Sequence, residues 1–383
     1  MQASPGEPLA REPQAAAEPA HSTLRVAIVS DALTGRNGVD GYYRDLAAHL
    51  RDRLSDIELI NPDPEQAPEL TRWSVPMPGD TTQSICVPRI RHVYARIVAI
   101  RPDVIIVPAP GPFGMLGAFA AKRLGVPVIA GLHTDLERLA HLYWSTARGR
   151  IAQRLLETLT RALFRSARAV VVNTDGMVPA ARRLKAPRTA LLGTPIAPDF
   201  LVPRTALAPS LQRVAYAGRL APEKNIEGLL KAAADLPHLQ FALAGDGPLQ
   251  ALVKTRAAQL HNLRYLGRLP RRGVAELLDA CELLVLPSRV EAFGTVALEA
   301  LARNRLVLVS PDCGIAHWPD LERAIFVIER GESLAQALER IRALPETARA
   351  ERAAFGLRAA LDLHRETLDA WVHLLESVVA LRA

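Results

Sequence analysis

The sequence predicts an α/β protein built from two Rossmann-like domains. Three observations carry this prediction: the length of 383 residues, the alternation of short apolar strands with helical segments, and a Pro- and Ala-rich break near the middle. A chain of this length exceeds what one compact core usually holds. Strands that alternate with helices on both sides of a break favour two separate parallel sheets.

The first domain is predicted to span residues 23–195, after an N-terminal extension at 1–22 whose Ala, Pro, Glu and Gln content is typical of disorder. Its first strand, 24–30, leads into a loop with Gly35 and Gly38, and a helix follows at 42–54 with Asp40 as its N-cap. Strand, glycine loop and helix are the usual opening of a doubly wound domain. The remaining elements are strands at 103–107, 126–130 and 167–173, with helices at 116–124 and 177–184.

Residues 196–210 lack any period and are predicted to be the interdomain linker. The second domain, 211–362, repeats the strand–helix alternation. Its predicted strands are 213–217, 240–244, 263–266, 282–287, 307–309 and 326–328. From Leu334 onward the sequence is helical with a break near Pro345, and the segment 363–383 is the last helix.

Two loops at strand ends of the second domain contain the candidate ligand-binding residues. Glu291 and Glu299 lie seven residues apart, with Phe293 and Gly294 between them and a helix start at Thr295, directly after a buried strand. A helix start attracts an anion, and carboxylates accept hydrogen bonds from hydroxyls. Upstream, a strand ends at Gly218 and the following loop carries Arg219 and Lys224, two cations suited to a diphosphate. The alternative for any one of these cations is an ordinary solvated loop.

Together these segments resemble the Glu-x7-Glu and Gly-Arg-x4-Lys motifs of family 4 retaining, nucleotide-sugar-dependent glycosyltransferases. The match extends over most of residues 24–330. The resemblance implies the GT-B fold, in which two Rossmann-like domains face each other across a cleft and the last helix crosses back to the first, acceptor-side domain. It also implies that Gly38 contacts the donor phosphates, that Gly218, Arg219 and Lys224 hold the diphosphate, and that Glu291 and Glu299 bind the donor sugar and the ribose.

His133 follows the strand that ends at Ala130, in a Gly-Leu-His-Thr-Asp segment. This segment resembles the His-Thr-Asp of lipid- and polysaccharide-directed mannosyltransferases in the family, where the histidine lines the cleft beside the donor sugar. A structural histidine is the alternative interpretation. A metal site with His141 lacks a completing carboxylate or thiolate, so neither a metal nor another cofactor is expected. Residues 245–248, Gly-Asp-Gly-Pro, are interpreted as a simple turn, and base discrimination is expected near Gly267-Arg268-Leu269.

The chain departs from the family pattern at residues 311–318, where a Gly-Gly-x-Pro-Glu-like turn is usual and the sequence reads Pro-Asp-Cys-Gly-Ile-Ala-His-Trp. We therefore expect a different surface at this part of the nucleotide or domain-closure region.

Charge is unevenly distributed along the chain. Residues 86–190 contain 17 Lys and Arg but 5 Asp and Glu, whereas the whole chain has a net charge of +7. A basic face of this kind attracts anionic lipid or nucleic acid. The arginines of residues 136–168 are interleaved with apolar residues, which fits either an ordinary solvated helix or a membrane-facing surface that meets a lipid-linked acceptor. No nucleic-acid-binding motif accompanies them, so nucleic acid is not expected as a partner.

The predicted activity is transfer of a hexose from a nucleoside diphosphate sugar to a glycan or glycolipid acceptor in cell-envelope synthesis. By resemblance, the acceptor attacks from the leaving-group face, and Glu291, His133, Arg219 and Lys224 are the catalytic candidates. The alternatives are a sugar-nucleotide epimerase of related fold and a basic nucleic-acid-binding protein. The three cysteines do not have the spacing of metal ligands, and no secretory signal is recognised. Both observations favour a cytoplasmic protein, with peripheral membrane attachment as a further expectation.

Overall fold

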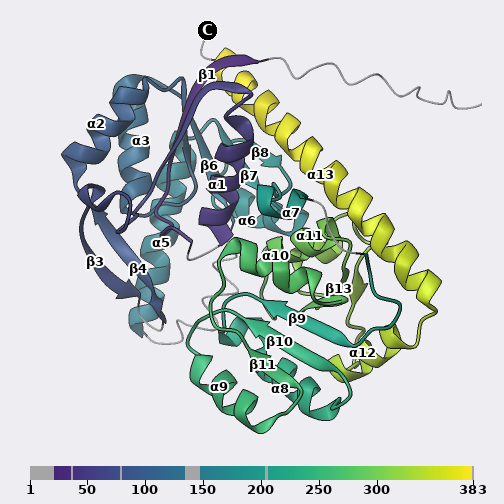
Figure 1. Cartoon of the computed structure of the whole chain (residues 1–383). Coiled ribbons are helices and arrows are strands. Elements are labelled where there is room, and N and C mark those ends of the chain that lie inside the picture. Colours follow the sequence, from purple (N-terminus) through teal and green to yellow (C-terminus); the bar gives the residue numbers. More distant parts are fainter. Residues whose placement is uncertain (1–20, 36–37, 78–79, 134–146, 203–205, 382–383) are drawn as a thin grey trace, which may run out of the picture.

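The computed structural model describes residues 21–35, 38–77, 80–133, 147–202 and 206–381 (Figure 1). Residues 1–20 of the expected extension lie outside this part of the chain, as do residues 136–146 of the expected amphipathic segment. Two six-stranded sheets and their covering helices form the two α/β domains that the sequence predicts.

The first sheet is entirely parallel in the order β2-β1-β5-β6-β7-β8. Its strands are β1 (Ser22–Val29), β2 (Leu54–Ile60), β5 (Val104–Val107), β6 (Val128–Leu132), β7 (Ala169–Val172) and β8 (Thr189–Leu191). The helices are α1 (Gly38–Leu50), α2 (Ile90–Ile100), α3 (Pro112–Leu124), α5 (Ala147–Ser166) and α6 (Val178–Arg183), with a 3-10 turn η2 (Asp175–Met177). The core strands β5 and β7 are buried at every residue, as expected for a sheet covered on both faces.

Strand β2, a two-stranded hairpin and helix α2 of the first domain were not predicted. Strand β2 begins at Leu54, where the expected helix was to end, because α1 starts and stops four residues earlier than predicted. The hairpin of β3 (Thr71–Met77) and β4 (Asp80–Pro88) and the helix α2 were also missed. One face of the hairpin leaves Trp73, Val75 and Ile85 exposed, so the strands lack the buried apolar run by which the others were found.

The second sheet is also parallel, in the order β11-β10-β9-β12-β13-β14. Its strands are β9 (Arg213–Ala217), β10 (Gln240–Ala244), β11 (Leu263–Tyr265), β12 (Leu283–Leu286), β13 (Leu306–Val309) and β14 (Phe326–Val327), and all six confirm predicted strands. The helices are α8 (Ile226–Asp235), α9 (Gln250–Gln259), α10 (Arg271–Asp279), α11 (Thr295–Ala302) and α12 (Leu334–Arg342), with 3-10 turns η3 (Pro222–Lys224) and η4 (Gly314–His317).

The segment expected to be the linker packs onto the second domain. Residues 198–201 form a short helix, α7 (Pro198–Leu201), and Ile196 and Phe200 are buried in the core of the second domain. Because these side chains are buried, the first half of the segment is fixed to the second domain.

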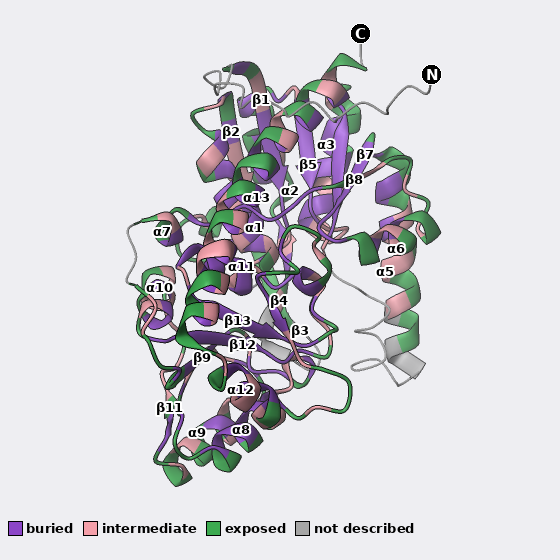
Figure 2. Cartoon of the chain, turned by 90° about the vertical axis from the view of Figure 1, so that its right-hand side faces the viewer, coloured by how far each residue is buried: buried purple, intermediate pink, exposed green. Residues whose placement is uncertain are grey.

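The last helix, α13 (Glu346–Ala380), is a single element of 35 residues that begins upstream of the expected start at 363 (Figure 1). Pro345 occupies its N-cap position, so the break expected there separates α12 from α13. The first half of α13 contributes Ala353 and Ala360 to the core of the second domain. Its second half contributes Trp371 and Leu375 to a core of the first domain (Figure 2). One continuous helix therefore packs against both domains.

Candidate functional site

The second-domain loops meet where the direction of the sheet connections reverses. Strands β9 and β12 are neighbours, but the chain leaves β9 toward β10 and leaves β12 toward β13. Ligands of open α/β sheets bind outside the carboxyl ends of the strands at such a switch point. Gly218 and Arg219 directly follow β9, and Glu291 follows β12.

Lys224 and Glu291, which are 67 residues apart in sequence, form an ion pair across this switch point. Lys224 Nζ donates to Glu291 Oε2 at 2.5 Å, and the Ser288 hydroxyl lies 3.4 Å from the same oxygen. The two side chains are 19% and 20% exposed. The turn η3 places the lysine, because its last residue is Lys224 and Asn225 then takes a left-handed conformation.

Arg219 lies beside a second carboxylate on the same loop. Its Nη2 is 3.3 Å from Oε1 of Glu223, a residue that is 4% exposed. The backbone carbonyl of Glu223 accepts from the amide of Arg289 at 2.7 Å, which ties this loop to the segment that carries Glu291. We refer to Arg219, Glu223, Lys224 and Glu291 as the charged cluster.

Gly245 allows the loops after β9 and β10 to approach closely. A Cβ atom built on Gly245 would lie 1.8 Å from the carbonyl oxygen of Gly218, and Gly245 has a φ of +143°. Gly247 has a φ of +146°, and a Cβ atom built on it would lie 2.5 Å from the carbonyl oxygen of Leu220. The glycines of residues 245–248 are thus explained by backbone packing, in line with the simple turn expected there.

Residues 311–318 pack against the loop that leads through Gly294 to the start of α11, and they form backbone hydrogen bonds with it. Gly294 has a φ of +100°, and Thr295 is the first residue of α11. The amide of Gly314 donates to the carbonyl of Glu291 at 3.0 Å, and that of Ile315 donates to Phe293 at 2.8 Å. The Phe293 ring is 2% exposed and packs edge-on against Trp318, 5.8 Å between centroids. The segment that departs from the family pattern therefore supports the Glu291 loop, and the Phe293 ring serves the core.

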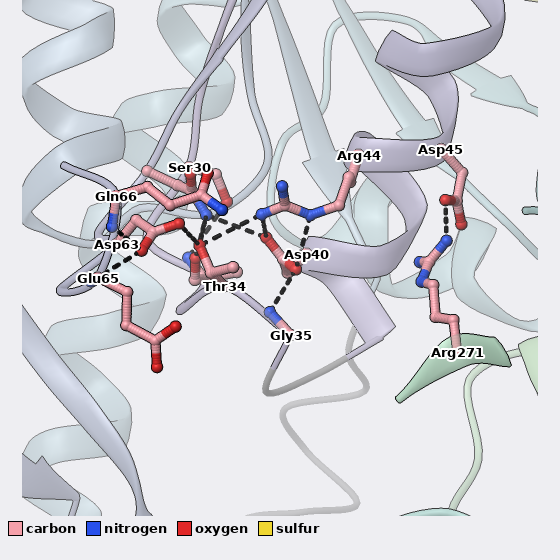
Figure 3. Close-up of polar contacts among 12 residues, drawn as sticks. Ser30, Thr34, Gly35, Asp40, Arg44, Asp45, Asp63, Glu65, Gln66 and Arg271 are labelled. Atoms are coloured by element: carbon pink, nitrogen blue, oxygen red, sulfur yellow. Dashed lines mark hydrogen bonds and ion pairs between the residues drawn. The ribbon is translucent and has the colours of Figure 1, made fainter. Parts of the chain in front are cut away.

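Glu299 lies one turn into α11 and is 8% exposed. Burial raises the pKa of its carboxyl to about 8, and Arg271 acts in the opposite direction. Arg271, the first residue of α10, also forms an ion pair with Asp45 of α1, whose side chain is 2% exposed (Figure 3). A cation of the second domain is thus placed between a carboxylate of each domain.

The glycine loop of the first domain forms a second bridge to the second domain. Arg268 Nη2 donates to the carbonyl of Gly35 at 2.6 Å. The Gly35 amide in turn donates to Asp40 Oδ2 at 2.7 Å, a bond that Figure 3 shows. Asp40 also pairs with Arg44 at 3.1 Å. The prediction that Asp40 caps α1 is wrong: the helix begins at Gly38, two residues earlier, so the Asp40 carboxylate reaches back to the loop. Gly38 itself is exposed, and a Cβ atom there would meet nothing within 4 Å.

His133 directly follows β6 and packs on two tyrosines of α1. Its Nε2 lies 2.8 Å from the hydroxyl of Tyr43, and its ring centroid lies 4.8 Å from that of Tyr42. Trp371 of α13 completes the group, because its Nε1 donates to the Tyr42 hydroxyl at 2.9 Å. Burial lowers the pKa of His133 to about 4, so the imidazole is neutral. We refer to Tyr42, Tyr43, His133 and Trp371 as the aromatic cluster.

A half-buried carboxylate at the switch point of the first sheet was not predicted. Asp31 follows β1 and accepts from the amides of Phe113 and Gly114, at 2.7 and 3.0 Å, at the start of α3. Burial raises its pKa to about 7. The available signal was the Gly111-Pro-Phe-Gly114 segment after an apolar strand, since a Cβ atom on Gly111 would lie 2.4 Å from the Asp31 carboxyl carbon.

The structure thus gathers Arg219, Lys224 and Glu291 in one cluster, while His133 belongs to another in the opposite domain. Sequence reasoning missed the residues that connect the halves, Asp45 and Arg271, because their signal is an ion pair between elements 226 residues apart. Within the described ranges, no group of three or more His, Cys, Asp or Glu side chains is placed to hold a metal ion.

Family models and curated relatives match both domains of the chain. The family described as "Glycosyltransferase Family 4" matches residues 36–199, and "Glycosyl transferases group 1" matches residues 203–355. The GDP-mannose-dependent alpha-mannosyltransferase of Mycolicibacterium smegmatis is 30% identical over 313 residues, which cover 76% of this chain and 80% of that protein. The Mycobacterium tuberculosis protein described by the same words is 26% identical over 307 residues, with the same shares of 76% and 80%.

Solved structures share the fold at lower sequence identity. Sucrose-phosphate synthase from Thermosynechococcus elongatus superposes with a TM-score of 0.71 at 19% identity, covering 93% of this chain and 100% of that chain. The Anabaena protein HepE, in complex with UDP and glucose, gives a TM-score of 0.65 at 17% identity, with 91% and 99% covered. With two parallel-sheet domains and matches along both of them, this chain belongs to the family 4 (group 1) glycosyltransferases of the GT-B fold.

Proposed function

We propose that this glycosyltransferase is a retaining enzyme that moves a hexose from a nucleoside diphosphate sugar to a glycan or glycolipid acceptor of the cell envelope. The observation that carries the proposal is the Lys224–Glu291 pair at the carboxyl ends of β9 and β12. It places a cation for the diphosphate next to a carboxylate for the sugar hydroxyls, at the switch point where such folds bind ligands.

The leaving group is an anionic diphosphate, so its charge must be stabilised as the glycosidic bond breaks. Lys224, Arg219 and the amides at the start of α11 supply that stabilisation in this proposal. Lys224 is paired with Glu291 in the structure. The diphosphate therefore shares or replaces an existing partner, and Glu291 becomes available to the sugar hydroxyls.

Glu299 is the proposed partner of the ribose. With its pKa raised to about 8, the group is mostly protonated at neutral pH. A neutral carboxyl can both accept a hydrogen bond from a ribose hydroxyl and donate one. The neighbouring Arg271 favours the ionised form, so the protonation state of Glu299 depends on whether Arg271 stays on Asp45.

The retaining course requires no separate protein base in this proposal. The acceptor attacks from the leaving-group face, and an oxygen of the departing diphosphate takes its proton. The anomeric configuration of the product, read by NMR, checks this: the product keeps the configuration of the donor if the proposal is right, and inversion would overturn it.

The donor is best identified with a panel of nucleotide sugars. Two relatives that each align with 76% of this chain are described as GDP-mannose-dependent, so GDP-mannose is the first donor to test. Thermal unfolding with UDP-, GDP- and ADP-sugars should give one selective increase in melting temperature, since a ligand that binds only the folded state stabilises it. Equal responses to every nucleotide sugar, or none, would contradict the proposed donor site.

An anionic membrane is the proposed surface on which a lipid-linked acceptor is met. Helix α5 exposes Ile151 and Leu155, one turn apart, beside Arg150 and Arg154. No helix in the described ranges is long and apolar enough to cross a bilayer. We expect flotation with anionic but not neutral liposomes near physiological salt. Flotation should weaken in Ile151→Ser/Leu155→Ser and persist in Val75→Ser, which alters the exposed hairpin. Equal binding to neutral vesicles would contradict this.

A further inference from the structure

Tyr43 is completely buried, and its hydroxyl makes one hydrogen bond within the described residues, to His133 Nε2 at 2.8 Å. The two rings meet edge to face, with centroids 5.3 Å apart. Gly131 makes this contact sterically feasible, because a Cβ atom there would lie 2.8 Å from both the Tyr43 oxygen and His133 Nε2. The glycine two residues before the histidine is therefore part of the arrangement that brings the two groups together.

The bond has two directions, and they leave different numbers of buried polar groups unpaired. If Tyr43 donates, His133 carries its proton on Nδ1, and only that N–H lacks a partner. If His133 donates through Nε2, the tyrosine proton has no acceptor among the described residues and Nδ1 has no donor. An unpaired buried group costs its desolvation free energy, so the first direction is favoured.

The neighbouring Tyr42 does not satisfy Nδ1, although its ring packs against the imidazole. The Tyr42 hydroxyl donates to the carbonyl of Gly193 at 3.0 Å and accepts from Trp371 Nε1 at 2.9 Å. Its proton is therefore already used, and its oxygen makes no hydrogen bond with Nδ1 of His133. The Nδ1–H group of His133 remains a donor whose acceptor has to come from outside the described residues.

We propose that Tyr43 is a positioning residue that holds His133 in the Nδ1–H tautomer and thereby makes it a hydrogen-bond donor to an oxygen of the donor sugar. Tyr43 does not touch the substrate in this proposal, since its hydroxyl is used by the histidine. Burial keeps both groups neutral near pH 7, which is consistent with a bond between an uncharged hydroxyl and an uncharged imidazole. The part that concerns the sugar rests on the proposed function, whereas the tautomer does not.

The tautomer is measured by long-range 1H–15N NMR on the full chain with 15N-labelled histidine, with the His133→Asn spectrum to assign the signal. We expect a protonated Nδ1 and an unprotonated Nε2 in the parent. Tyr43→Phe should shift the tautomer population of His133 toward Nε2–H, because the hydroxyl that donates a hydrogen bond to unprotonated Nε2 is gone. Tyr42→Phe is the matched control: it removes a buried hydroxyl from the adjacent position and should leave the His133 signals in place.

Kinetics test the second half of the proposal. Loss of one oriented hydrogen bond should lower kcat/KM for the donor about tenfold in Tyr43→Phe, with a smaller loss in Tyr42→Phe. A parent with a protonated Nε2 would overturn the tautomer assignment, even if the variant does not fold. An active Tyr43→Phe enzyme with a changed tautomer but parental kcat/KM would overturn the donor role alone. An enzyme with no activity toward any nucleotide sugar, but with the expected tautomer, would instead contradict the proposed function.

Discussion

The two clusters in the opposing domains prepare their functional groups in different ways. The charged cluster of the second domain neutralises Lys224 with Glu291 and places Arg219 beside Glu223, and the Lys224–Glu291 pair stays about one-fifth exposed. The aromatic cluster of the first domain contains no formal charge near pH 7, and Tyr43 and Trp371 are fully buried.

This difference indicates how each cluster responds to a ligand. Partly solvated ion pairs can exchange one partner for another at modest cost, because water compensates during the exchange. A buried aromatic group cannot rearrange without opening the core, so its geometry is fixed in advance by packing. We infer that the second domain adapts to the charge of the donor while the first domain presents a rigid hydrogen-bonding edge.

The largest expected effect comes from removing the lysine of the charged cluster. Lys224→Ala should lower kcat by about 10²–10³-fold, the range typical for loss of one group that stabilises developing negative charge. Arg219→Ala should lower turnover by a similar order. Initial rates with saturating donor measure this, and circular dichroism checks the fold. Lys231→Ala, on the exposed face of α8, is the control and should retain parental activity. Parental turnover by Lys224→Ala would mean that the charged cluster does not hold the diphosphate.

The next effect concerns the anchor of the aromatic cluster. Trp371→Phe removes the indole N–H that donates to Tyr42 and leaves a small space in the core. The free energy of unfolding should fall by about 1–3 kcal/mol, as measured by denaturant titration. His373→Ala changes the exposed face of the same helix and should alter stability little. Should Trp371→Phe lose activity while its stability is unchanged, the cluster would not be the rigid support inferred above.

The smallest effect is a change in how stability depends on pH. The folded pKa of Glu299, about 8, lies above the ordinary value of 4.5, so the folded chain retains a proton that the unfolded chain releases. This contribution to stability is complete below pH 4.5 and is lost as pH rises toward 8. Glu299→Gln should therefore show a shallower decline in unfolding free energy over this range, by up to about 1 kcal/mol per pH unit.

The unfolding free energies of the parent and of Glu299→Gln are best compared between pH 7 and 8. At lower pH, Asp31, whose pKa is raised to about 7, also changes the unfolding free energy of both proteins. Parallel curves for the parent and the variant would mean that Arg271 already keeps Glu299 ionised.

The sequence predicted the fold well where strands are buried on both faces. β9 and β10 have the predicted bounds, because their apolar runs end at glycines or polar turns. It failed for β2, which is buried only at Leu54, Ile57 and Ile60, and for the β3–β4 hairpin, in which residues 72–76 are all exposed. Neither has the continuous buried apolar run of a core strand. Lys224 and Glu291 could be predicted as members of one site, since both follow strands that a doubly wound sheet places side by side.

The amino-acid sequence by itself determined the two parallel sheets, the loops at their carboxyl ends, and the residue types that those loops present. Apolar runs and glycines are visible within short stretches of sequence, so they can be recognised without knowledge of contacts between distant residues. Tertiary structure alone decided which partners those residues take: Arg271 reaches Asp45 in the other domain, α13 connects both cores, and Tyr43 bonds to His133. Hydrogen bonds, buried charges and the resulting pKa values depend on distances between residues remote in sequence, and only the folded chain sets those distances.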